Sequence, residues 1–110
     1  MLSSRRPLPL NTNKPRILSL LGLCKKSGNL SLGFDSCLEA TQQRKTQLIL
    51  TTMDLSENTR QKLRNHIEEN LLYETDLSMD DIHKALGKSS GIISINEGGF
   101  AQKIKQLLYS

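Results

Sequence analysis

The sequence predicts an α/β fold: a three-layer α/β/α sandwich in which helices cover both faces of a four-stranded, mostly parallel (mixed) sheet. Two observations predict it. Short apolar runs alternate along the whole chain with segments in which apolar residues recur at helical spacing. The run over residues 48–50 is apolar throughout, which is typical of a strand buried on both faces. A chain of 110 residues has the length of one such domain.

The start and stop signals of the helices give the expected order of elements. Lys25 and Lys26 lie in the last turn of the first helix, where cations interact favourably with the helix dipole. Ser78 with Asp81 has the pattern of a capping box. The expected elements are helix 16–26, strand 30–32, a helix after Gly33, strand 47–52, helix 56–70, strand 71–75, a helix from Ser78 that stops at Gly87, strand 91–96 and helix 97–108.

The net charge of +4 comes from the N-terminal part of the chain. Arg5, Arg6, Lys14 and Arg16 account for it, and residues 17–110 carry 11 basic and 11 acidic side chains. Three prolines in the first 15 residues predict an extended, flexible basic segment over 1–15, followed by one domain over 16–110. Such a segment either attracts nucleic acid electrostatically or is a solvated leader, and the sequence does not favour one over the other.

The residues of catalytic chemistry do not assemble in this sequence. Cys24 and Cys37 fall on apolar helical stripes and are expected to be buried, reduced thiols. His66 and His83 are far apart, and neither has a neighbouring nucleophile. We therefore expect no enzyme activity, no metal and no cofactor. No apolar run approaches the ~20 residues of a membrane span, and the start lacks the apolar core of a signal peptide, so a cytoplasmic protein is expected.

The carboxyl ends of the strands are the expected binding edge, because open α/β sheets place ligands there. Loops 26–35, 52–58 and 74–78 are expected to meet at this edge. Lys25 and Lys26 either contact phosphate or serve only as a helix C-cap. Gly33 lies where a helix N-terminus presents free amides to an anion, or it serves turn geometry alone. Residues 44–45 form a second basic turn at the opposite end of the sheet.

Four spaced blocks resemble a known family. They are LLGLCKKSGNLSLG at 20–33, DLSENT at 54–59, ALGK at 85–88 and EGGFA at 97–101. Together they resemble YlxQ-type bacterial proteins, members of the kink-turn-binding ribosomal protein (L-seven-Ae) superfamily, over residues 17–108. The resemblance implies an α/β/α sandwich that binds RNA, with the N-terminus of the second helix entering the RNA.

The family's kink-turn binders begin that helix with Gly-x-Asn-Glu-x-x-Lys. Here Gly33, Asp35, Ser36 and Glu39 stand at those positions, so only the glycine matches. Glu39 reverses the sign of a lysine that would face phosphate, and phosphate neutralisation supplies much of RNA affinity. We therefore expect recognition of structured RNA through its backbone and shape, without kink-turn specificity.

The expected partners are ribosomal or other structured RNA and a ribosomal or translation-factor protein. The alternatives are a protein–protein interaction module on the same fold without RNA contact, and an accessory domain of an RNA methyltransferase. The expected RNA-binding residues are Lys25, Lys26, Gly28, Asn29, Gly33, Asp35, Ser36, Asn58 and Thr75.

Overall fold

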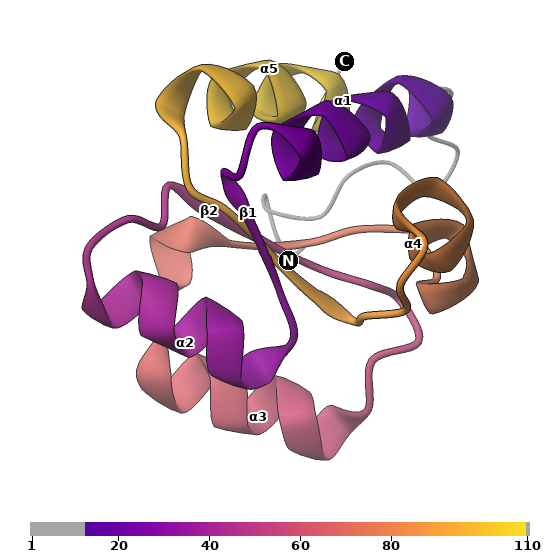
Figure 1. Cartoon of the computed structure of the whole chain (residues 1–110). Coiled ribbons are helices and arrows are strands. Elements are labelled where there is room, and N and C mark those ends of the chain that lie inside the picture. Colours follow the sequence, from indigo (N-terminus) through magenta and orange to yellow (C-terminus); the bar gives the residue numbers. More distant parts are fainter. Residues whose placement is uncertain (1–12, 110) are drawn as a thin grey trace.

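The computed structural model describes residues 13–109 and arranges them as a sheet between two layers of helices (Figure 1). The predicted α/β/α class is confirmed. The elements are α1 (Lys14–Lys26), β1 (Leu30–Leu32), α2 (Phe34–Gln42), β2 (Leu48–Thr51), α3 (Glu57–His66), a 3₁₀ turn (Glu69–Leu71), β3 (Leu72–Glu74), α4 (Met79–Leu86), β4 (Ile92–Ile95) and α5 (Gly98–Leu108).

The two faces of the sheet carry separate apolar cores. On one face α1, α4 and α5 bury Ile17, Leu21 and Ile104 against the sheet. On the other face Cys37 of α2 and Leu63 of α3 are fully buried. Every residue of β2 and β4 is buried because these two strands lie in the middle of the sheet. The apolar run at 48–50 is thus explained.

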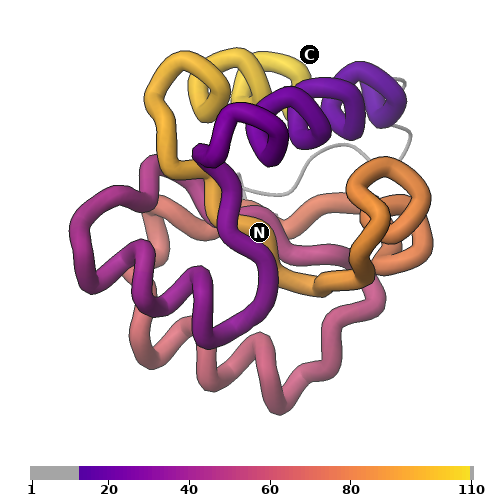
Figure 2. The backbone as a smooth tube through the Cα atoms, viewed as in Figure 1, coloured from indigo at the N-terminus to yellow at the C-terminus, as the bar shows by residue number. Residues whose placement is uncertain are grey.

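The sheet is mixed, and the prediction that it is mostly parallel is wrong. Its strand order is β1-β4-β2-β3, and only β2 and β3 are parallel. β4 runs antiparallel to both β1 and β2. The reason is the connection through α4: the chain leaves the end of β3, forms α4 and re-enters the sheet beside the end of β2, where the Thr52 amide donates to the Gly91 carbonyl at 3.0 Å. Figure 2 shows this turn in orange.

The helix ends follow local chemistry. The Ser56 and Ser78 hydroxyls cap α3 and α4, and Asp81 completes the predicted capping box at Ser78. Gly87 ends α4 in the left-handed conformation, with φ of 78°. α3 ends at His66, four residues before the predicted 70, because the chain becomes extended at Ile67 and buries that side chain.

The start of α1 changes the predicted domain boundary. α1 begins at Lys14, two residues before the predicted start, with Pro15 in its first turn, where a missing amide hydrogen costs nothing. Lys14 and Pro15 therefore belong to the domain. The rest of the predicted flexible segment, residues 1–12, lies outside the described residues.

Candidate nucleic-acid interface

The predicted binding edge exists, and we call it the strand-exit end because β1, β2 and β3 all finish there. It is formed by residues 33–36, 52–58, 75–78 and 89–91. Backbone hydrogen bonds join these segments, from Gly33 to the Ile92 carbonyl at 3.0 Å and from Met53 to the Leu77 carbonyl at 2.8 Å. The Asp54 carboxylate accepts the Met79 amide at 3.1 Å and so binds the start of α4.

The strand-exit end is acidic. Its four segments contain four carboxylates and no lysine or arginine; the carboxylates are Asp35, Asp54, Glu57 and Asp76. Arg60 lies nearby but is nearly buried, and it forms ion pairs with Glu57 at 3.6 Å and with Glu74 at 3.6 Å. An RNA phosphate approaching this edge would meet negative charge, which opposes binding.

The predicted polar residues at this end differ in accessibility. Asp35 and Ser36 are exposed in the first turn of α2, and Asn58 is exposed in the first turn of α3. Thr75, in contrast, is only 6% exposed. Its hydroxyl donates to the Thr51 carbonyl at 2.8 Å and accepts the Leu77 amide at 3.2 Å. The Thr75 side chain therefore closes a turn and offers little surface to RNA.

The other predicted residues lie at the opposite end of the sheet. The predicted loop 26–35 contains the whole of β1, so its two halves are separated by the length of that strand. Lys25, Lys26, Gly28 and Asn29 precede β1 and lie where β4 finishes, as the hydrogen bond from the Asn96 amide to the Asn29 carbonyl at 2.9 Å shows. The prediction that all candidate residues share one edge is wrong. We call this second end, residues 25–29, 43–47 and 96–99, the strand-entry end.

A polar pocket of about 550 Å³ opens along β1 at the strand-entry end. We call it the β1 pocket. It brings three predicted RNA-binding residues together, namely Gly28, Asn29 and Ser36. The other residues that line it are Leu30, Ser31, Glu39, Ala40, Gln43, Lys45 and Asn96. Ser31, Lys45 and Asn96 were not predicted as site residues; in the case of Asn96, only the pairing of β1 with β4 places it beside Asn29.

Positive charge is concentrated on one layer of helices. α1, α4 and α5 together carry seven basic and two acidic side chains, whereas α2 and α3 carry three of each. The cations of this layer and its adjoining loop that are exposed and form no ion pair with any other residue of 13–109 are Arg16, Lys25, Lys26, Lys88 and Lys103. Cations without carboxylate partners are available to bind an anion.

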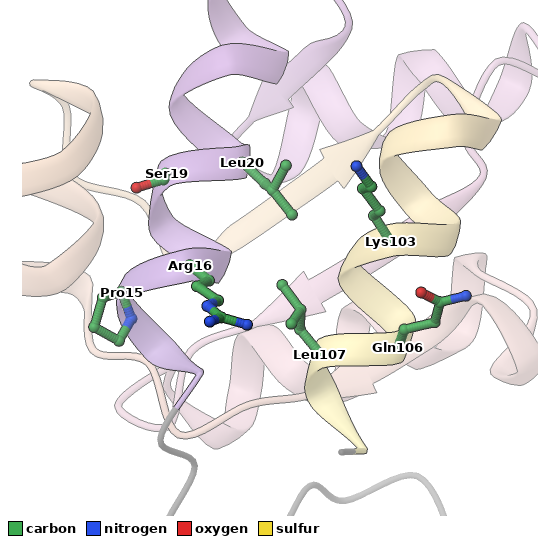
Figure 3. Close-up of a pocket in the computed structure, with 7 residues that line it drawn as sticks. All are labelled: Pro15, Arg16, Ser19, Leu20, Lys103, Gln106 and Leu107. Atoms are coloured by element: carbon green, nitrogen blue, oxygen red, sulfur yellow. The ribbon is translucent and has the colours of Figure 1, made fainter.

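Two grooves flank α1 on this basic face. One, of about 500 Å³, lies between α1 and α5; Leu20 and Leu107 point toward each other across it, with Arg16 and Lys103 alongside (Figure 3). The other, of about 590 Å³, lies between α1 and α4 and is lined by Lys25 and Lys26. The basic face is therefore a surface with two depressions.

The buried thiols are chemically quiet. Burial raises the pKa of Cys24 to about 11, with a further contribution from the Glu97 carboxylate, and burial raises the pKa of Cys37 to about 12. Thiols are nucleophilic only as thiolates, so both are unreactive near neutral pH. Within residues 13–109 no three His, Cys, Asp or Glu side chains are placed to hold a metal ion, and no helix is long and apolar enough to cross a membrane.

Comparisons with known proteins support the resemblance. The RNA-binding protein YlxQ of Enterococcus faecium is 27% identical over 100 residues, which cover 87% of this chain and 94% of that protein. A solved Bacillus halodurans C protein of unknown function has a TM-score of 0.77 at 24% identity, covering 84% of this chain and 96% of that one. The Giardia lamblia 15.5kD RNA binding protein has a TM-score of 0.65 at 14% identity, covering 97% and 94%.

No protein-family model matches the chain. The predicted similarity to YlxQ-type proteins is confirmed by the curated relative. The two solved structures share the fold of this chain.

Proposed function

We propose that this chain, which is similar to YlxQ over most of its length, is a non-enzymatic RNA-binding protein that holds structured RNA by its phosphate backbone. We further propose that it acts in the cytoplasm, on the ribosome or in translation. One observation carries the proposal: Arg16, Lys25 and Lys26 of α1 and Lys103 of α5 are exposed and form no ion pair within the described residues. The name of the curated relative supports the same function.

The basic face suits a phosphate backbone. Arg16 and Lys26 are ten residues apart on α1, which is about 15 Å along the helix axis, so they can meet phosphates well separated along a strand. Each phosphate neutralised by Lys or Arg releases counterions and strengthens binding. The acidic strand-exit end, with Asp35 where the kink-turn binders have Asn, is directed away from RNA in this proposal.

Charge substitutions of equal size on the two helix layers test the proposal. Lys25→Gln with Lys26→Gln removes two positive charges from the basic face. Lys62→Glu on α3 changes the net charge by the same amount, and Lys62 is exposed and forms no ion pair with the described residues. We expect the double variant to bind a labelled RNA hairpin about tenfold more weakly. The slope of log affinity against log salt concentration should fall in magnitude by about two, since each phosphate contact contributes about one.

The measurement is fluorescence anisotropy at two salt concentrations, with a kink-turn RNA and a straight duplex of equal length. Lys62→Glu should change the affinity by less than about twofold. Lys62 lies on the other layer of helices, and the interaction between exposed charges is largely screened beyond a Debye length of ~8 Å. Equal losses in the two variants would show that net charge alone attracts the RNA. A strong preference for the kinked RNA would place binding at the strand-exit end and overturn the proposed face.

The runner-up function is a protein-interaction module without RNA contact. It predicts that the chain retains a protein partner after nuclease treatment and binds neither RNA. No contact within the described residues favours it over RNA binding.

A further inference from the structure

The β1 pocket has the chemistry of a nucleotide site. Its walls combine side-chain amides that both donate and accept hydrogen bonds, hydroxyl groups, one cation and one carboxylate, that of Glu39. The amides belong to Asn29, Gln43 and Asn96, and the cation is Lys45. Amides of this kind bind the edges of nucleobases, and a lysine binds phosphate as a point charge. A volume of about 550 Å³ is large enough for one nucleotide.

A chain of hydrogen bonds holds Asn96 and Ser31 in the wall of this pocket. The Thr46 hydroxyl contacts Ser94 at 3.0 Å, the Ser94 hydroxyl donates to the Asn96 side-chain oxygen at 2.6 Å, and the Asn96 amide nitrogen donates to the Ser31 hydroxyl at 3.0 Å. Ser94 is fully buried. Because both ends of the Asn96 amide are held, its orientation is set before any ligand arrives, which lowers the entropy lost on binding.

The polar groups on the open side of the pocket retain unused capacity. The Asn29 side-chain nitrogen donates to the Ser27 hydroxyl at 3.0 Å, while its oxygen accepts no hydrogen bond from residues 13–109. The Asn96 amide keeps its second hydrogen and its second lone pair. The pocket wall thus offers both an acceptor and a donor to a ligand.

The pocket is continuous with the basic face through the chain itself. Lys25 and Lys26 end α1, and Gly28 and Asn29 follow within four residues to line the pocket. Gly28 adopts φ of 81°, a conformation that glycine reaches without strain, so the chain turns sharply from the basic helix into β1. Residues 25–29 therefore connect the end of the basic helix directly to the wall of the β1 pocket.

We infer that the β1 pocket receives a single unpaired nucleotide of the RNA, with its base edge on Asn29 and Asn96 and its phosphate on Lys45. This inference rests on the proposed function and specifies which feature of the RNA the chain recognises. Aromatic side chains that stack bases are absent from the pocket wall, so recognition here works through hydrogen bonds to the base edge. The ligand class is an unpaired ribonucleotide, such as a bulge, at the end of a duplex region.

The test compares one RNA hairpin that is fully paired with the same hairpin carrying a single-nucleotide bulge, with each of the four bases in turn. We expect the full chain to prefer at least one bulged hairpin by about tenfold, within the range of about 5- to 150-fold that one good base contact supplies. Asn29→Ala should remove most of this preference and leave affinity for the paired hairpin unchanged. Lys45→Gln should weaken the bulged hairpin selectively.

Asn65→Ala is the matched control. It is the same substitution at an exposed asparagine of α3 that is not among the candidate RNA-binding residues. It should leave the bulge preference intact. A thermal melt of each variant checks folding, and titration of the ¹⁵N-labelled chain with the four nucleoside monophosphates should shift the side-chain amide signals of Asn29 and Asn96.

The outcomes separate the two proposals. Equal binding of paired and bulged hairpins, or loss of the preference in Asn65→Ala, would overturn the nucleotide site and leave RNA binding intact. Failure to bind any hairpin would overturn the proposed function instead. Broad shifts along 30–32 on adding a protein partner, with none on adding nucleotides, would show that the free edge of β1 pairs with a protein strand.

Discussion

Arg44 and Gly87 provide a paired test of backbone conformation in which the two substitutions should have opposite effects on stability. Arg44 follows α2 with φ of 61°, the one positive φ outside glycine in residues 13–109, and Gly87 ends α4 with φ of 78°. The left-handed conformation costs an L-residue about 1–2 kcal/mol. Arg44→Gly should therefore stabilise the fold, and Gly87→Ala should destabilise it.

The expected magnitudes follow from two opposing terms. Glycine relieves the left-handed strain but loses about 0.5–1 kcal/mol more conformational entropy on folding. The difference leaves about 0.5–1 kcal/mol of stabilisation for Arg44→Gly and a similar loss for Gly87→Ala. A side chain at position 87 would meet no atom within 4 Å, so no steric clash adds to the loss. The change in Tm should be about 4–8 °C per kcal/mol for a domain of this size.

Urea denaturation followed by far-UV circular dichroism measures both variants, and their effects should add in the double variant because the two helices cover opposite faces of the sheet. A clear loss of stability in Arg44→Gly would refute the reasoning, since it would mean that the Arg44 side chain makes contacts worth more than the strain. Arg44→Asn, which tolerates this conformation, should lie between arginine and glycine. An unchanged m value would confirm that the compactness of the unfolded chain is the same.

Two further predictions concern the titrating groups. The pKa of Asp81 is lowered mainly by the Ser78 amide, which donates to its carboxylate, and then by the Lys14 ammonium at 3.4 Å. Because the folded pKa lies below the unfolded value, Asp81→Ala should cost about 1 kcal/mol of stability at pH 7. In urea titrations this difference should shrink as pH falls below ~4 and vanish once the folded carboxylate is protonated. Burial raises the pKa of Cys24 to about 11 and of Cys37 to about 12. A chromogenic disulfide reagent at pH 8 should therefore label neither thiol in the native chain and both thiols in urea. Rapid labelling of the native chain would contradict the burial of the thiols.

Local features of the fold were predictable from sequence because they depend on residues close together in the chain. The Ser78–Asp81 capping box spans three residues, and the buried faces of the helices follow a period of 3.6 residues. Thr75 shows the limit: a threonine after a strand usually predicts a solvated loop, yet its burial depends on contacts with Thr51, 24 residues earlier. The role of Arg60 was missed likewise, because Arg60 lies on α3 and its partner Glu74 lies on β3.

The predicted site residues lie at two ends of the sheet, and the direction of β4 is the feature that the sequence could not predict. An apolar run such as 92–95 has the same pattern in a parallel and an antiparallel strand, so sequence cannot choose between them. With β4 antiparallel to β1, Leu30 faces Ile95, and the residues just outside this pair, Asn29 and Asn96, become neighbours. Had β4 run parallel, Asn96 would lie at the acidic strand-exit end. The reversal of one strand therefore brings Asn96 into the β1 pocket, at the same end of the sheet as Lys25 and Lys26 and opposite the edge where the family resemblance predicts RNA.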